Sequence, residues 1–427
     1  MQQIKEILGK YKRVERHVFY LIGAQFCLQL INSAFFILFN YFMEKEGYPD
    51  YEIAEIVAER FGAVMLLAAP LGFFIRGRRL KPFFYVACAV VPTFSLLCIY
   101  AAENHFDTLL TWGMRAWGGG FVFMQVTGLP FILLNVKREN HSEAIAMWFQ
   151  MWSVTVFFAG VVHFVLNTLE PTLFDERNML IIFSLIGYCS FYFISKIRIE
   201  EQSSEPLPVR ESSGLAKAFY TIYDVVRPYD WGRIVSTLIP TLIIAVGAGF
   251  TIPVINLFFL NIHGIEADTF AVMSAMTYVM VAIVVVFMPY IRRRFGYNIA
   301  ITFFQSMAVI SLLIMATTEY YAEAGFAAGI AVFFYMIRQP FMNAAGPMTS
   351  ELTMYYVGER NQEMISALNA SIWSGSWFVS MQIFAWLRQM EYRYVTIFLI
   401  TVVLYAIGVA WYAYLIYLYH RRDKVVP

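Results

Sequence analysis

The amino-acid sequence predicts an all-α membrane protein with twelve transmembrane helices in two pseudosymmetric six-helix bundles. The first observation behind this prediction is composition: 59% of the 427 residues are hydrophobic and 14% are charged, whereas soluble domains carry about 25% charged residues. The second is length, because the apolar runs each extend over the roughly 20 residues that a helix needs to cross a bilayer. The third is that lysine and arginine gather in every second loop between these runs.

The predicted spans form two sets of six, separated by the only long polar stretch of the sequence. An N-terminal bundle is predicted at 1–200, a cytoplasmic linker at 201–232 and a C-terminal bundle at 233–427. Within the linker, Leu215, Phe219, Ile222 and Val226 recur at helical spacing, which predicts an amphipathic helix on the membrane surface. The spans are placed at 17–43, 52–75, 82–102, 108–136, 143–168 and 178–197, then at 233–261, 268–290, 297–318, 324–356, 362–387 and 394–419.

The orientation follows from the basic residues, because cytoplasmic loops carry an excess of lysine and arginine. One side of the predicted membrane holds the basic segments at 5–16, 76–81, 137–138, 196–233, 292–294 and 421–424, together with Arg360. The opposite side holds Lys45, Arg177, Arg388 and Arg393. Both termini and the linker are therefore predicted to be cytoplasmic.

Motifs that would indicate an enzyme are missing from the sequence. It contains no HExxH, no GxSxG and no phosphate-binding Walker loop, and its four cysteines lack the spacing of a metal or redox site. The net charge of +1 gives no reason to expect a nucleic-acid partner. The sequence therefore predicts a protein that is not an enzyme and that needs no cofactor or metal.

Corresponding features recur in the two predicted halves. The second span ends APLGFFIRGRRLKPFF and the eighth ends MPYIRRRFGYNIAI, so that a proline or glycine and then a basic turn close both. The fourth span holds Arg115 and the tenth holds Arg338, and a glycine and a proline follow each arginine. Transporter folds built from two related halves show internal symmetry of this kind.

These segments resemble the major facilitator superfamily. The turn after the second span is similar to that family's cytoplasmic signature, although the acidic residue of the signature is missing. Arg115 before three glycines resembles the family's fourth span, and Gly247–Gly249 with Pro253 is similar to the break in its seventh. The tenth span, IRQPFMNAAGPMTSELTMYYVGERNQ, resembles a branch of bacterial permeases with twelve helices. The signature keeps Gly72, Arg76, Gly77, Arg78 and Arg79.

The resemblance covers nearly the whole chain and implies a secondary transporter of the bacterial inner membrane that works by alternating access. It implies a monomer among membrane lipids, with a small organic solute that is anionic, zwitterionic or sugar-like and is carried by proton-coupled symport. The run at 143–168 lacks the Gly-Pro signature of the family's drug/proton antiporters, which favours uptake. Two alternatives stay open: an exporter of amphipathic drugs or lipids, and a membrane sensor or enzyme that does not transport.

Four charged residues stand out within the predicted spans, where each needs a partner or a function. Glu59 and Arg115 are each predicted about 12 Å deep, and the resemblance implies that their spans are neighbours. An ion pair is therefore expected, either structural or involved in proton and solute exchange. Arg338 is predicted at the middle of the tenth span, either as a clamp for a carboxylate or phosphate or held by carbonyls of broken helices. Glu351 lies about 20 Å further along the same helix, near its cytoplasmic end.

The remaining polar residues of the spans are assigned to three roles. Gln25, Gln29 and Asn32 form one stripe at helical spacing, which faces either a partner helix or the solute; the resemblance favours the solute. His163 is either a proton relay, because histidine titrates near neutral pH, or a packing residue. The predicted solute contacts are Gln25, Gln29, Asn32, Arg115, Asn256, Arg338, Asn343, Asn369, Trp373 and Trp377; the proton-coupling residues are Glu59, His163 and Glu351; the gating residues are Gly72, Arg76, Arg78, Arg79, Arg292 and Arg293.

Overall fold

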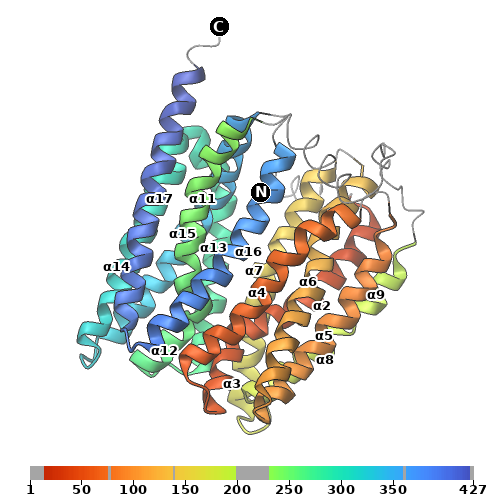
Figure 1. The fold of residues 1–427 in the computed structure, drawn as a ribbon, viewed down its shortest axis with the longest axis vertical. Helices are drawn as coiled ribbons and strands as arrows, with labels where there is room; N and C mark the ends of the chain where they lie inside the picture. The colour runs from red at the N-terminus through yellow and green to blue at the C-terminus, as the bar shows by residue number, and fades with distance from the viewer. Residues whose placement is uncertain (1–13, 76–77, 138–139, 199–229, 359–361, 424–427) are drawn as a thin grey trace, which may run out of the picture.

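The computed structural model describes residues 14–75, 78–137, 140–198, 230–358 and 362–423. Nearly all of these residues are helical, as the composition predicts. Arg76 and the predicted amphipathic helix at 215–226 lie outside the described residues. The first half contains α2 (Arg16–Ala34), η1 (Phe35–Phe39), α3 (Asn40–Lys45), α4 (Asp50–Phe74), α5 (Lys81–Glu103), α6 (Asp107–Asn135), α7 (His141–Leu169), α8 (Glu176–Gly187) and α9 (Ser190–Lys196) (Figure 1).

The second half repeats this arrangement in the green and blue part of Figure 1. Its first membrane crossing is interrupted, as the Gly247–Gly249 and Pro253 pattern predicts, because proline has no N–H to continue the helical ladder. Gly296 has a φ of 77° and marks the turn between the second and third crossings. The elements are α11 (Trp231–Thr251), η3 (Ile252–Val254), α12 (Ile255–His263), α13 (Ala267–Tyr297), η4 (Asn298–Phe303), α14 (Phe304–Thr317), η5 (Thr318–Tyr321), α15 (Ala327–Val357), α16 (Gln362–Gln389) and α17 (Tyr394–Asp423).

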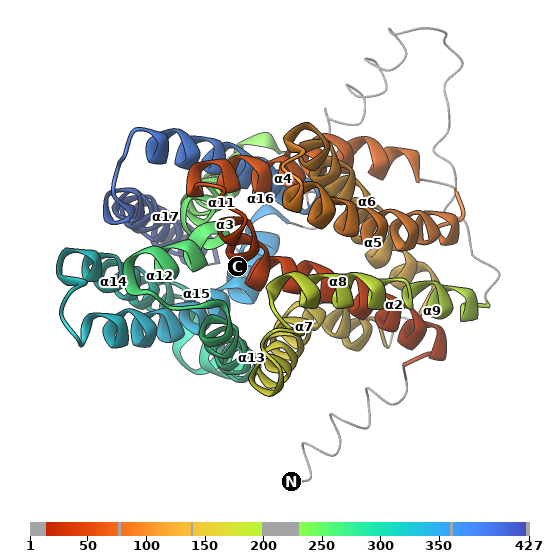
Figure 2. The same cartoon turned by 90° about the horizontal axis from the view of Figure 1, so that it is seen from below.

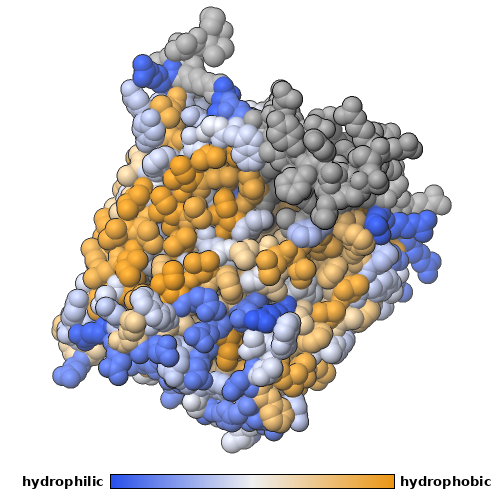
Figure 3. All heavy atoms as spheres, viewed as in Figure 1, coloured by the Kyte–Doolittle hydropathy of each residue, from blue (hydrophilic) through white to orange (hydrophobic). Residues whose placement is uncertain are grey.

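A broad apolar band crosses the face of the molecule that Figure 3 shows, and more hydrophilic residues lie below it. Eight segments of the described chain are long and apolar enough to cross a membrane. The helices α4, α6, α15 and α16 run alongside them with 25, 29, 31 and 28 residues. Large apolar side chains, which are costly to expose to water, are exposed in both halves. Among them are Trp112, Phe149, Phe157, Phe287 and Val403. The chain is therefore an integral membrane protein.

The two halves are helical bundles that meet along two pairs of helices, α4 with α16 and α7 with α13 (Figure 2). Small residues allow these helices to approach closely. A Cβ atom built on Gly160 of α7 would lie 2.5 Å from the carbonyl oxygen of Ala271 in α13. A Cβ atom on Gly62 of α4 would likewise meet the Phe378 ring of α16 at 2.9 Å. Close packing at small residues holds membrane helices together, because lipid removes the hydrophobic drive.

Candidate functional site

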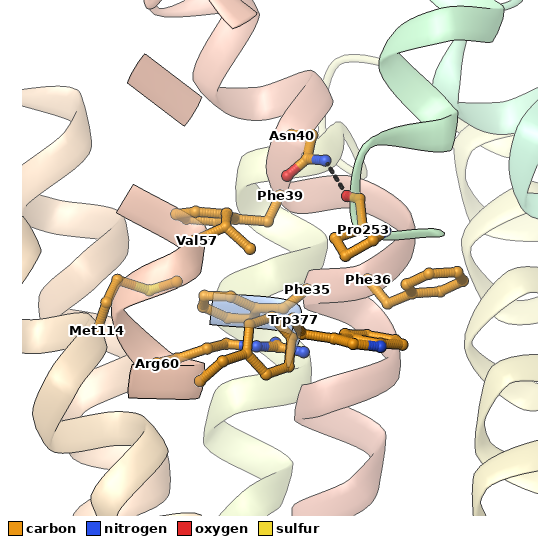
Figure 4. A pocket seen from close by; sticks show the side chains of 10 residues that line it. Phe35, Phe36, Phe39, Asn40, Val57, Arg60, Met114, Pro253 and Trp377 are labelled. Carbon is orange, nitrogen blue, oxygen red and sulfur yellow. Dashed lines mark hydrogen bonds between the residues drawn. The ribbon is translucent and has the colours of Figure 1, made fainter. Parts of the chain in front are cut away.

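A small niche lies between the bundles where α2 passes into η1 and α3 (Figure 4). Its volume is about 20 Å³, which is room for about one water molecule. The backbone of η1 is a π-helix, a local widening that is frequent at functional sites. Three of its five residues line the niche. The first bundle contributes Phe35, Phe36, Phe39, Asn40, Val57, Arg60, Phe61 and Met114, and the second contributes Pro253 and Trp377.

Among the described residues that line this niche, Arg60 is the only charged one. It lies ten positions after Asp50, the first residue of α4, so it is about 15 Å deep in a hydrocarbon core of about 30 Å. Its guanidinium stacks on Phe61 and Trp117, with ring centroids at 4.4 Å and 4.8 Å. In the described part of the chain it makes no hydrogen bond or ion pair. Figure 4 shows its guanidinium in the middle of the niche, beside Trp377.

The neighbouring acid does not neutralise Arg60, because it has another partner. The predicted pair between Glu59 and Arg115 forms, with the Arg115 Nε atom 2.6 Å from a Glu59 carboxylate oxygen. Arg115 also stacks on the exposed ring of Trp112 at 4.7 Å. Successive residues of a helix point about 100° apart, so α4 directs Glu59 toward α6 and Arg60 toward the niche. The first pair is neutral, whereas the niche retains a positive charge.

Asn40 closes the niche at one end and joins the two bundles. Its amide nitrogen donates to the Pro253 carbonyl oxygen at 2.9 Å and to the Asn256 side-chain oxygen at 2.8 Å. The break at η3 leaves that carbonyl without its helical partner, and Asn40 satisfies it. Asn256, a predicted solute contact, is 2% exposed and therefore lies in this closure.

A second set of contacts joins the bundles at the same end, where α4 begins and α16 ends. One carboxylate oxygen of Asp50 accepts from Arg388 Nε at 2.6 Å and from the Tyr394 hydroxyl at 2.8 Å. The Tyr41 hydroxyl donates to the Ile265 carbonyl oxygen at 3.2 Å. This end, where α3 and α12 lie close together in Figure 1, is closed by polar contacts between the bundles.

The opposite end of the first bundle contains a second, larger cavity, of about 210 Å³. The predicted gating residues Gly72 and Arg78 line it, with Val126 and Pro130 of α6 on the facing side. Arg78 is exposed and stacks on Phe74 at 3.9 Å, and Arg79 is exposed beside it. The basic turn after α4 therefore borders an opening at the end away from Asn40.

The corresponding turn of the second bundle brings together two predicted residues. Arg292, near the end of α13, forms an ion pair with Glu351 of α15, while the adjacent Arg293 is exposed. Both partners are less than one-third exposed. The pair lies within the second bundle and links the ends of α13 and α15.

Arg338 lies away from the niche, in the interior of the second bundle. It is fully buried, and its guanidinium donates to the Tyr405 hydroxyl and to the Gln339 side-chain oxygen, both at 3.2 Å. Its Nε atom has no partner. These contacts correspond to an arginine held by the protein rather than to a clamp exposed to solute in this conformation. Its partners are side-chain oxygens, not the backbone carbonyls of the second sequence-based interpretation.

The other predicted solute contacts are distributed around the niche and along the helices. Trp377 lines the niche, and Trp373 lies 6.4 Å from it between ring centroids. Gln25 and Gln29 are buried, and each has a side-chain oxygen without a partner. Asn32 and Asn369 are partly buried, whereas Asn343 is exposed and donates to the Gln339 carbonyl oxygen at 2.8 Å.

His163 of α7 is buried, with 1% of its surface exposed. Neither ring nitrogen has a hydrogen-bond partner among the described residues. It lies one helical turn from Gly160, at the packed contact between α7 and α13. A buried imidazole without partners is unusual, because buried polar groups are normally hydrogen-bonded.

Comparisons with known proteins bear on the fold. No protein-family model and no curated protein sequence matches the chain. Among solved structures, the nucleoside transporter NupG is similar with a TM-score of 0.71 at 9% identity, over 93% of this chain and 99% of that one. A bacterial homologue of the iron transporter ferroportin, in an inward-facing state, has a TM-score of 0.71 at 10% identity, over 94% and 98%. A D-xylose–proton symporter has a TM-score of 0.70 at 12% identity, over 92% and 96%.

The chain has the fold of the major facilitator superfamily. The predicted fold class, two six-helix bundles of an all-α membrane protein, is confirmed. At 9–12% identity these similarities concern the fold alone. Arg60, which lines the niche, is not among the site residues predicted from the sequence. The available signal was the pair of adjacent charges in VAERFGA: once Glu59 pairs with α6, the next residue must face elsewhere.

Proposed function

We propose that this protein is a secondary transporter that moves a small organic solute across the membrane by alternating access. The observation that carries the proposal is a niche between two bundles that is closed at one end by Asn40 and by Asp50, each bonded to the other bundle. Breaking these contacts while the opposite end closes would expose the niche to the other side of the membrane. The fold, which the chain shares with transporters of several solutes, supports the same proposal.

The orientation and the coupling belong to this proposal. The basic residues favour cytoplasmic termini in a bacterial inner membrane, which makes the end held by Asp50 and Arg388 the outer one. Proton-coupled symport is supported by three titratable groups: Glu59, Glu351 and His163. Of these, Glu59 and Glu351 are held in ion pairs, whereas His163 has no partner among the described residues. The protein acts as a monomer and has no enzymatic activity in this proposal.

The test measures solute uptake before and after a reversible crosslink between the two bundles. Asp50→Cys and Arg388→Cys are introduced into a background in which the four native cysteines are replaced, and the protein is reconstituted into proteoliposomes. Uptake is measured for labelled sugars, nucleosides, amino acids, peptides and organic acids, with an imposed proton gradient and without one. We expect uptake of one solute class to stop after a short thiol-reactive linker joins the two positions and to return after reduction.

The controls identify the competing functions. The single variants Asp50→Cys and Arg388→Cys, treated with the same linker, should keep their uptake. Binding of a solute without movement in any liposome preparation would contradict transport and support a sensor. If only lysolipids or amphipathic drugs are moved, the result would contradict a polar solute and support the exporter alternative.

A further inference from the structure

The niche around Arg60 contains several hydrogen-bond donors that have no partner among the described residues. The guanidinium has five N–H groups, and none of them bonds to the described part of the protein. The indole N–H of Trp377, which lines the niche, is also buried without an acceptor. In the closure above it, the amide nitrogen of the 2% exposed Asn256 is a third donor without a partner. No aspartate or glutamate lines the niche.

We propose that the niche binds the single oxyanion group of an organic monoanion and that Arg60 supplies its counter-charge. The proposal rests on the proposed transport function and names the substrate class of the same site. An oxyanion provides acceptors, which the unpaired donors need, and it carries the charge that Arg60 lacks. A planar guanidinium fork matches two oxygens of one carboxylate, which gives a strong and oriented contact.

The position of Arg60 in the membrane adds an energetic reason. An ionised side chain near the bilayer centre is costly unless it is paired or hydrated. Two other deeply placed arginines already have polar partners: Arg115 has Glu59, and Arg338 has Tyr405 and Gln339. Arg60 has aromatic rings alone. A bound anion would neutralise the positive charge of Arg60, and this attraction would hold the anion in the niche.

The lining also argues against other solute classes. A neutral sugar would bond to the donors of the niche but would leave the positive charge of Arg60 without a counter-charge. An organic cation would suit the aromatic rings but would be repelled by the guanidinium. In this conformation the niche has room for about one water molecule, so in the proposal the oxyanion group enters when the two bundles move apart. The body of the solute would pack against rings such as Phe35, Phe36 and Phe61.

The competing explanation is that Arg60 is structural, held by its stacking on Phe61 and Trp117. A bound ligand separates the two explanations, because stacking alone gives no preference for anions. The probes are matched in shape and differ in charge: benzoate, benzamide and benzylamine. Benzenesulfonate and phenylphosphonate distinguish a carboxylate from other oxyanions. Binding to the full chain in detergent is measured by titration calorimetry.

The variants are Arg60→Gln, Arg60→Lys and Trp377→Phe, with Arg177→Gln as the control at an arginine that is paired with Glu103 and lies away from the niche. We expect benzoate to bind and benzamide and benzylamine to bind at least tenfold more weakly. Arg60→Gln should weaken benzoate binding by about 10- to 100-fold, the range for losing a hydrogen bond to a charged group. Arg60→Lys should keep part of the affinity, since it retains charge without the fork.

Trp377→Phe should weaken benzoate binding to a smaller extent and leave the preference for the anion. Arg177→Gln should bind benzoate like the unaltered protein. Equal affinity for benzoate and benzamide, or undiminished benzoate binding in Arg60→Gln with an intact unfolding transition, would overturn the proposal. If Arg60→Gln does not fold, the Arg60→Lys affinities and the benzoate-to-benzamide ratio decide alone.

The same variants distinguish this proposal from transport itself. Anion binding that depends on Arg60, without flux in proteoliposomes, would support the binding site and contradict the proposed function. Flux of a neutral solute that Arg60→Gln leaves unchanged would support transport and contradict the anion site.

Discussion

Replacing Asp50 by alanine should open the end of the molecule that Asn40 and Asp50 close. One Asp50 oxygen holds both Arg388 and Tyr394, at 2.6 Å and 2.8 Å, and thereby ties α4 of one bundle to α16 and α17 of the other. The side chains of Asp50 and Arg388 are 11% and 21% exposed. Removing one partner of a fully buried pair costs about 3–5 kcal/mol, and exposed pairs are worth at most about 1. A loss of about 2 kcal/mol is therefore expected for this partly buried pair.

That loss acts on one side of the conformational equilibrium, because the contact joins the bundles only when this end is closed. A change of about 2 kcal/mol multiplies the population of the state that is open at this end about 30-fold. The assay uses Val57→Cys, a niche position, in a background without the native cysteines. Labelling by a membrane-impermeant maleimide, added from the outer side, reports the population of the open state, and its rate should rise by about the same factor.

The matched control is Arg177→Gln. Arg177 pairs with Glu103 at 2.9 Å, at the same end of the molecule but within one bundle. Its loss should leave the labelling rate unchanged. Equal labelling of Asp50→Ala and the unaltered protein, or an equal increase in the control, would refute the assignment of Asp50 to the closure.

Three further substitutions test other contacts. Gly118→Ala places a Cβ atom 2.3 Å from the Arg60 carbonyl oxygen. The overpacking should destabilise the protein by about 1–3 kcal/mol and lower its melting temperature. The control Gly329→Ala, at a glycine with open space around it, should leave the melting temperature unchanged. A double-mutant cycle of Arg292→Gln and Glu351→Gln should give a coupling of up to about 1 kcal/mol in unfolding free energy; zero coupling would contradict a stabilising pair. His163→Asn should flatten the dependence of uptake on pH between about 5 and 8; an unchanged profile would exclude His163 as the coupling group.

The sequence was sufficient for features that depend on one helix or on adjacent ones. Long apolar runs predicted the helices, and the Gly247–Gly249 and Pro253 pattern predicted the break that forms at η3. The equal depth of Glu59 and Arg115, together with the neighbouring spans that the resemblance implies, predicted their pair. Each of these follows from helical rise, backbone chemistry or the cost of a lone charge in lipid.

The closure between the bundles could not be predicted in the same way. Asp50 and Arg388 are separated by 338 positions, and their contact depends on how two rigid bundles lean together. For the same reason, the sequence could not show toward which neighbouring helix the Arg338 side chain points. Two interpretations fitted the sequence, and only the packing of α15 against α17 shows the guanidinium turned to Tyr405 and away from the niche.

Arg60 and Glu59 illustrate why adjacent charges in a membrane helix need to be assigned separately. The two side chains together have no net charge, so the sequence alone does not reveal that Arg60 lacks a counter-charge. In three dimensions, α4 turns Glu59 to Arg115 and leaves Arg60 among aromatic rings. The tight crossing at Gly118, against the backbone of Arg60 itself, fixes the rotation of α4 that separates them. A larger residue at 118 would therefore disturb the direction of the Arg60 side chain as well as the packing, and so would affect anion binding together with stability.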